Sequence, residues 1–129
     1  MNARFTGVFI LLACLLSPAN AQTKAAQGEY LVRAGGCMSC HTADPARPFA
    51  GGRPIATPFG NVYAPNITSD RETGIGAWTD AQFIQTMHTG VSPEGRKLDG
   101  KYMPWQAVGT LSDDELRGLL MALKEKKGA

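Results

Sequence analysis

The amino-acid sequence predicts a small all-α domain in which three to four short helices are joined by long loops. Three observations support this fold class. Three separate segments carry helix signals, and two of them combine a capping sequence with apolar residues at helical spacing. Glycine and proline, 15 and 8 residues of 129, are concentrated between these segments. The length suits a single domain of this kind.

Residues 1–21 read as a secretory signal peptide. Arg4 provides the positive start, Phe5 to Leu16 the short apolar core, and Ala19-Asn20-Ala21 the small residues of a cleavage site. Two alternatives stay open: a retained anchor helix, and a lipoprotein acylated at Cys14. The apolar run is short for a membrane span, which needs about 20 residues. Cleavage after Ala21 would leave one domain, residues 22–129.

This segment predicts export to the periplasm, an oxidising compartment. No other apolar stretch approaches the length of a membrane span, so we expect no transmembrane anchor in the mature chain. The formal net charge of +2, from 13 basic and 11 acidic residues, is too small for a nucleic-acid groove. Nucleic acid is therefore excluded as a partner.

The first two helices have clear boundaries. The first runs from about Lys24 to Ala34, with Gly35-Gly36 as its end. The second begins at Thr79, where Thr79-Asp80-Ala81-Gln82 forms a capping box, and ends at Gly90. Its apolar face consists of Phe83, Ile84 and Met87.

The third helix has the strongest signals. Ser112-Asp113-Asp114-Glu115 forms a capping box, and acidic residues occupy the positive end of the helix dipole. Leucines at positions 116, 119, 120 and 123 predict a buried stripe. Three short helices are nevertheless a thin core for a chain of this length.

The segment from Pro45 to Trp78 has little periodicity, because prolines and glycines alternate along it. A structureless run of this length is unusual in a compact domain. It becomes reasonable if the loop wraps a large rigid object that supplies the missing core. The sequence therefore predicts a bound prosthetic group.

Cys37-Met38-Ser39-Cys40-His41 identifies that group. Two thiols three positions apart on one helical turn can add to the two vinyl groups of a haem, and the adjacent histidine then lies under the iron as its proximal ligand. We predict one covalently attached haem c per chain, bound through Cys37 and Cys40 with His41 on the iron. A plain disulfide, a thioredoxin-type redox pair and a zinc site are the alternatives.

The sixth iron ligand must come from farther along the chain. Met103 is the predicted ligand, because it lies in a loop without helical period and is fixed by Pro104. Four other residues are weaker candidates. Met38 lies within the attachment motif, Met87 and Met121 lie on apolar helix faces where they fill the core, and His88 lies near a helix end at the surface. Ligation by His41 and Met103 would leave no open iron position, and such a site moves single electrons.

With these residues placed, the chain resembles a class I c-type cytochrome. A further series of segments follows in order: Gly28-Glu29-Tyr30-Leu31-Val32, Ala34-Gly35-Gly36-Cys37, Gly51-Gly52, Thr57-Pro58-Phe59-Gly60, Asn66-Ile67-Thr68-Ser69-Asp70 and Thr73-Gly74-Ile75-Gly76-Ala77-Trp78. This series resembles single haem domains in the cytochrome c subunits of bacterial membrane-bound alcohol, aldehyde and gluconate dehydrogenases, and in related cytochromes of molybdenum hydroxylases.

The resemblance implies a small class I cytochrome c fold wrapped around one haem. It implies that the long loop holds the haem propionates, with Arg53, Asn66, Thr68, Trp78 and Trp105 as candidate donors. It also implies that the last helix crosses the first at Gly28. Because the last helix has no aromatic residue there, we expect an aliphatic side chain to make this contact.

The function expected from these features is electron transfer, not catalysis. A periplasmic or membrane-bound dehydrogenase would donate single electrons, and a terminal oxidase, a reductase or another cytochrome would accept them. The free carrier would be a monomer that docks through an apolar patch around Gly35, Gly36, Met38 and the Met103 loop. The alternatives are a tightly bound electron-transfer subunit of a dehydrogenase complex, and an enzyme or gas sensor with an open haem.

Overall fold

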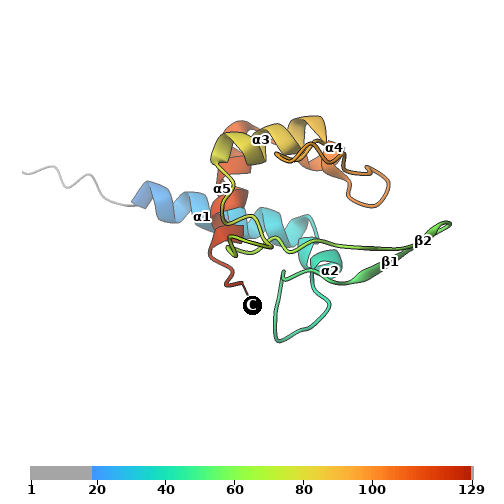
Figure 1. Ribbon diagram of the computed structural model, residues 1–129. Helices are drawn as coiled ribbons and strands as arrows, with labels where there is room; N and C mark the ends of the chain where they lie inside the picture. The colour runs from blue at the N-terminus through green and yellow to red at the C-terminus, as the bar shows by residue number, and fades with distance from the viewer. Residues whose placement is uncertain (1–18, 129) are drawn as a thin grey trace, which may run out of the picture.

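The chain folds into five helices and one β-hairpin within residues 19–128, the part that the computed structural model describes (Figure 1). The helices are α1 (Ala19–Ala34), α2 (Cys37–His41), α3 (Asp80–Thr89), α4 (Trp105–Val108) and α5 (Asp113–Lys124). The hairpin consists of β1 (Pro54–Thr57) and β2 (Gly60–Tyr63). The predicted signal peptide lies largely outside the described residues, and Ala19 to Ala21 form the start of α1.

The two terminal helices cross at a pair of glycines (Figure 1). A Cβ atom on Gly28 would overlap the carbonyl of Gly118, and it would also lie 2.8 Å from the backbone nitrogen of Leu119. The expectation of an aliphatic side chain against Gly28 is therefore wrong. The α5 backbone itself makes this contact, because neither glycine has a side chain to separate the helices.

Both predicted capping boxes are confirmed. Thr79 Oγ1 accepts a hydrogen bond from the Gln82 backbone nitrogen, and the Thr79 backbone nitrogen donates to the Gln82 side chain. Ser112 and Glu115 form the same pair of bonds at α5. The leucine stripe of α5 is buried, with exposed fractions between 0% and 5%. It packs with Val32, Phe49, Ile75 and the apolar face of α3 in one hydrophobic cluster. Helix α3 ends at Gly90, as the sequence predicts.

Charged side chains connect the two ends of the chain. Lys24 Nζ lies 3.1 Å from Asp114 Oδ1, and Lys126 Nζ lies 2.6 Å from Glu29 Oε2. The hydrogen bond from Lys126 lowers the pKa of the Glu29 carboxyl. The backbone oxygen of Lys126 accepts hydrogen bonds from Ser69 N and Ser69 Oγ, at 3.0 and 2.8 Å. The segment after α5 thereby holds α1 and the long loop together.

The prediction of an all-α fold is only partly right, because the long loop contains the hairpin. Its two strands pair antiparallel, with Pro54 opposite Tyr63 and Thr57 opposite Gly60. Every residue of β2 is exposed, so the hairpin lacks the apolar alternation that predicts a half-buried strand. Local backbone pairing and the turn at Pro58 and Phe59 form it instead.

Two short helices account for the remaining differences from the predicted set. Helix α2 carries the Cys-x-x-Cys-His motif, which was expected to form one helical turn. Helix α4 follows Pro104 and was not predicted as a helix. The α4 residue Trp105 packs its indole ring against Gly90 at the end of α3. No helix within residues 19–128 has the length and apolar character needed to cross a bilayer.

His88 links the end of α3 to the start of α5. Its Nδ1 lies 3.0 Å from the Gly109 carbonyl oxygen, and its Nε2 lies 3.0 Å from Asp113 Oδ1. Both facing groups are acceptors, and only a protonated imidazole carries a hydrogen on each nitrogen. The hydrogen bond to Asp113 raises the pKa of His88 above its ordinary value, and the Gly109 carbonyl adds to the effect, while desolvation opposes it.

We expect His88→Ala to lower the free energy of unfolding in mild acid but not in alkali. A raised folded-state pKa stabilises the protein fully below the unfolded-state value of about 6.5, and this stabilisation is lost as the pH rises through the folded-state value. Urea unfolding at about pH 5.5 and about pH 9 measures the difference between the two proteins. An equal loss of unfolding free energy at both pH values would contradict the expectation. Asp113→Asn should cause the same pH-dependent loss, because it removes the carboxylate that faces His88.

Candidate functional site

The predicted attachment motif forms one short helix, α2, directly after α1. The side chain of Ser39 donates to the Gly36 carbonyl oxygen at 2.6 Å and holds the start of this turn. Cys37 is half-buried against the hydrophobic cluster, whereas Cys40 is exposed. Both cysteines are free thiols. One helical turn therefore presents two thiols and His41 together, as the sequence predicts.

His41 is buried, with 6% of its surface exposed. Its Nδ1 lies 2.7 Å from the carbonyl oxygen of Pro65, and since a carbonyl can only accept, Nδ1 carries the hydrogen. Burial lowers the pKa of His41, opposed by this hydrogen bond, so the ring is neutral near pH 7. Within residues 19–128, Nδ1 is the only nitrogen of this ring that forms a hydrogen bond. The ring thus keeps one lone pair available, which is the form that binds iron.

The long loop closes on His41 through Gly51. Gly51 N donates to the His41 carbonyl oxygen at 2.8 Å, and Gly52 N donates to Ala64 O at 2.8 Å. Gly51 has a φ of +76°, and a Cβ atom there would lie 2.5 Å from the Pro65 carbonyl carbon. Only glycine combines this backbone conformation with such a close approach. Gly51 therefore places the Pro65 carbonyl within reach of the histidine ring.

The thiols fit the alternatives to haem attachment less well. Burial raises the pKa of the Cys37 thiol, and the nearby Cys40 adds to this effect. A thioredoxin-type pair requires a lowered thiol pKa. Residues 19–128 contain no group of three or more His, Cys, Asp or Glu that could hold a metal ion, so the ligand set of a zinc site is missing.

Met103 comes from a separate segment, between the turn at Gly100 and α4. Its side chain is half-buried and packs against the same hydrophobic cluster as Cys37. Its backbone nitrogen donates to Asp99 O at 2.8 Å, and its carbonyl oxygen accepts from Trp105 N at 2.6 Å. These bonds fix the backbone on both sides of the thioether.

The other candidate ligands have roles elsewhere. Met87 is buried in the hydrophobic cluster, and both ring nitrogens of His88 have hydrogen-bond partners. Met38 lies within α2 and is 52% exposed. Met121 is half-buried on α5. Among the candidates, Met103 alone lies in a loop, half-buried against the core.

Two of the five candidate propionate donors form hydrogen bonds within the long loop. Thr68 is fully buried and donates its hydroxyl to Asn66 Oδ1 at 2.7 Å. Asn66 Nδ2 donates to Thr73 Oγ1 at 2.9 Å. These hydrogen bonds shape the turn that follows Pro65. Arg53 is exposed, and the rings of Trp78 and Trp105 are half-buried.

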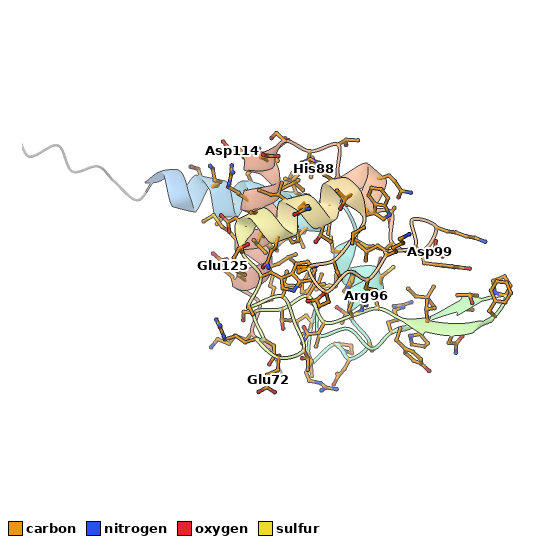
Figure 2. All side chains as sticks on the ribbon, turned by 45° about the horizontal axis from the view of Figure 1, so that its top comes forward. Glu72, His88, Arg96, Asp99, Asp114 and Glu125 are labelled. Carbon is orange, nitrogen blue, oxygen red and sulfur yellow. The ribbon has the colours of Figure 1, made fainter. Side chains whose placement is uncertain are left out.

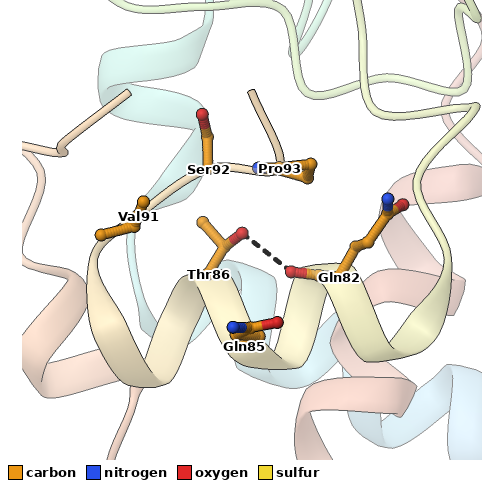
Figure 3. A pocket seen from close by; sticks show the side chains of 6 residues that line it. All are labelled: Gln82, Gln85, Thr86, Val91, Ser92 and Pro93. Carbon is orange, nitrogen blue, oxygen red and sulfur yellow. Dashed lines mark hydrogen bonds between the residues drawn. The ribbon is translucent and has the colours of Figure 1, made fainter. Parts of the chain in front are cut away.

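A pocket of about 240 Å³ lies beside α3 and is separate from the attachment motif (Figure 3). Its lining is mostly polar: Gln82, Gln85, Thr86, Val91, Ser92 and Pro93. The Thr86 hydroxyl donates to the Gln82 carbonyl oxygen at 2.8 Å across its floor. None of the motif residues lines it.

The residues present fit a covalently bound haem. The site combines two free thiols on one turn, a buried neutral histidine with an available nitrogen, and a half-buried thioether. Cys37 and Met103 pack against the same hydrophobic cluster as the half-buried side chains of Leu31 and Ile67.

Comparison with known proteins shows the family to which the chain belongs. The chain is 42% identical over 93 residues, 72% of its length, to the gluconate 2-dehydrogenase cytochrome c subunit of Pantoea cypripedii. It is 39% identical over 93 residues to the cytochrome c subunit of alcohol dehydrogenase (quinone) from Gluconobacter oxydans. The chain is a c-type cytochrome related to dehydrogenase cytochrome subunits. The resemblance expected from the sequence is thereby confirmed. A separate comparison with protein-family models found no match.

A further relative of this cytochrome is the fructose dehydrogenase cytochrome subunit of Gluconobacter japonicus, 36% identical over 105 residues, 80% of the chain. The chain spans 19% to 21% of the length of these three curated relatives. A stretch of 93 residues within a chain of 129 always includes residues 37–93. The matched part therefore contains both the attachment motif and the hairpin.

Proposed function

We propose that this cytochrome is a periplasmic single-haem electron carrier. The observation that carries the proposal is His41, a buried neutral ring whose Nδ1 is fixed by the Pro65 carbonyl while Nε2 keeps a free lone pair. The Pro65 carbonyl fixes the tautomer that keeps its lone pair on Nε2, and this is the form in which a histidine ligates a metal ion.

Each residue of the site has a defined role in this proposal. Cys37 and Cys40 would hold one haem c covalently, and His41 and Met103 would ligate its iron. When bound, the group supplies a reversible one-electron couple between ferric and ferrous iron. The thioether sulfur of Met103 favours the ferrous state. With both of these residues on the iron, no position would be left for oxygen or peroxide, and the protein would carry single electrons.

The electron donor in this proposal is a periplasmic or membrane-bound dehydrogenase. Cytochrome c subunits of gluconate and alcohol dehydrogenases, to which the chain is similar, support this choice. A terminal oxidase, a reductase or another cytochrome accepts the electron. Ala34, Gly35, Gly36 and Met38 are all exposed beside the motif, so they can form the apolar patch through which the haem edge is reached.

A second candidate is a fixed subunit of a dehydrogenase complex, which the names of the same relatives favour. Gel filtration of a native extract separates the two, because a free carrier elutes at the size of its monomer. Co-elution with a substrate-oxidising activity supports the fixed subunit.

Replacing Met103 with alanine tests the assignment of the sixth ligand. We expect complete loss of the long-wavelength sulfur–iron absorption band, conversion of the iron to high spin, and a lower reduction potential, because the thioether no longer stabilises ferrous iron. Optical spectra and a redox titration of the holoprotein measure all three. Met87→Ala is the matched control, since its sulfur lies in the hydrophobic cluster and the band should persist. Retention of the band in Met103→Ala would reject this ligand.

A further inference from the structure

The hairpin projects from the body of the protein as an arm, residues 54–63 (Figure 1). Five large apolar side chains are exposed within residues 23–128, and three of them lie on this arm. Phe59 at the tip is 99% exposed, Tyr63 is 65% exposed and Val62 is 43% exposed. Exposed apolar groups gathered on one feature mark an interaction surface more often than scattered ones do.

Charges are absent from the arm. The sequence from Pro54 to Ser69 contains no Asp, Glu, Lys, Arg or His. The charged side chains labelled in Figure 2, such as Arg96 and Asp114, lie on the body. Exposed strand edges in soluble proteins are ordinarily protected by charged residues, and this hairpin has none on either strand. An uncharged arm with unprotected strand edges carries a risk of aggregation, and a binding role would explain why the arm is present.

The tip of the arm is ordered. Thr57 Oγ1 accepts a hydrogen bond from Phe59 N at 3.1 Å and donates to the Gly60 carbonyl oxygen at 2.6 Å. One side chain therefore fixes the turn on both sides of the phenyl ring. An apolar anchor presented by an ordered turn loses less conformational entropy on binding than one on a loose loop.

The base of the arm adjoins the iron-binding histidine. Gly51, three residues before β1, donates to the His41 carbonyl oxygen, and Pro65, two residues after β2, accepts from His41 Nδ1. A protein that grips the arm is therefore held next to the electron-transfer site.

We propose that the arm docks the dehydrogenase that donates electrons, by inserting Phe59 into an apolar pocket on that enzyme. This inference rests on the proposed function. The matched stretch shared with the dehydrogenase subunits includes the arm, which supports this occupant. The exposed parts of Phe59, Tyr63 and Val62 offer about 400 Å² for burial, at about 200 Å² for a full aromatic side chain. A stable dimer needs about 800 Å² per partner, whereas transient redox encounters need less, so a second copy of this chain is the poorer occupant.

Reduction kinetics of the holoprotein test the proposal. The electron source is the membrane fraction of the bacterium that makes this chain, supplied separately with gluconate, ethanol or fructose. We expect Phe59→Ser to slow haem reduction at least tenfold with the substrate that reduces the wild type, and Phe59→Leu to restore the rate to within threefold. Tyr30→Ser, which removes a 69% exposed aromatic on α1, is the matched control and should change the rate less than twofold.

Reduction by ascorbate separates this proposal from the proposed function. Ascorbate needs no docking arm, so all variants should react with it at the wild-type rate. If ascorbate does not reduce the haem of the wild type, the proposed electron carrier is rejected. If none of the three substrates drives haem reduction by the membranes, the dehydrogenase donor is rejected, and the docking role of the arm is rejected with it. A Phe59→Ser rate equal to wild type overturns the arm alone. Two other results would also overturn the arm as a dehydrogenase-docking surface. One is a wild-type dimer in gel filtration that Phe59→Ser abolishes, and the other is wild-type binding to phosphatidylcholine vesicles that Phe59→Ser abolishes.

Discussion

The double variant Cys37→Ser/Cys40→Ser is expected to lose all covalently bound haem. Each thioether forms when a thiol adds across a vinyl group, and a serine hydroxyl does not make this bond under the same conditions. Acidified organic solvent extracts haem that is not covalently attached, so the haem left on the precipitated protein measures the result.

The third cysteine provides the matched control. Cys14 falls within the predicted signal peptide, and Cys14→Ser should leave the covalent haem unchanged. The same variant tests lipoprotein anchoring, because an acylated chain would lose its membrane attachment. Covalent haem on the double variant, or its loss from Cys14→Ser, would contradict the assignment of the motif.

Gly28→Ala is expected to destabilise the protein by about 3 kcal/mol, at the upper end for overpacking in a core. Helix propensity alone predicts the opposite sign, because alanine favours a helix over glycine by about 1 kcal/mol. The added methyl group would overlap the Gly118 carbonyl, and backbone atoms cannot move aside as a side chain can. Urea unfolding followed by circular dichroism measures the free energy of unfolding.

Two control variants isolate the steric cause. Ala26→Gly changes an exposed position of the same helix and should cost about 1 kcal/mol through propensity alone. Gly118→Ala should destabilise less than Gly28→Ala, since its methyl group would lie 2.8 Å from the nearest backbone oxygen, that of Lys24. A stabilised Gly28→Ala variant would contradict the close crossing.

The features predicted correctly from the sequence are the local ones. Thr79 with Gln82, and Ser112 with Glu115, satisfy backbone groups within a single turn, so four residues determine the outcome. The leucine stripe of α5 likewise depends only on helical period. The Cys-x-x-Cys-His motif is local too, and its helical turn is reproduced in α2.

The features missed depend on residues far apart, or on surfaces without an apolar pattern. The Gly28–Gly118 crossing joins two helices from opposite ends of the chain. All of β2 is exposed, so its sequence lacks the alternation of apolar and polar residues that predicts a half-buried strand. Helix α4 has only four residues and follows a proline. Short elements of this kind depend on their surroundings, here the packing of Trp105 on Gly90.

The candidate site divides in the same way. The thiols and His41 could be assigned from five consecutive residues, whereas the Pro65 carbonyl lies 24 residues away and is placed by Gly51. The pair Gly51-Gly52 was a visible signal of close backbone approach. The hydrogen bonds of Asn66 and Thr68 within their own turn are visible only in the three-dimensional structure, and their role toward the propionates stays a prediction.

The joining of the two chain ends has a consequence for the order of folding. Lys24 pairs with Asp114 and Glu29 with Lys126, across 90 and 97 positions of sequence. Contacts of such long range form late, because closing the intervening loop costs entropy first. During synthesis, the Cys-x-x-Cys-His motif emerges before the helix α5 that completes its core. Under the proposed function, this is the interval in which both thiols are accessible for haem attachment.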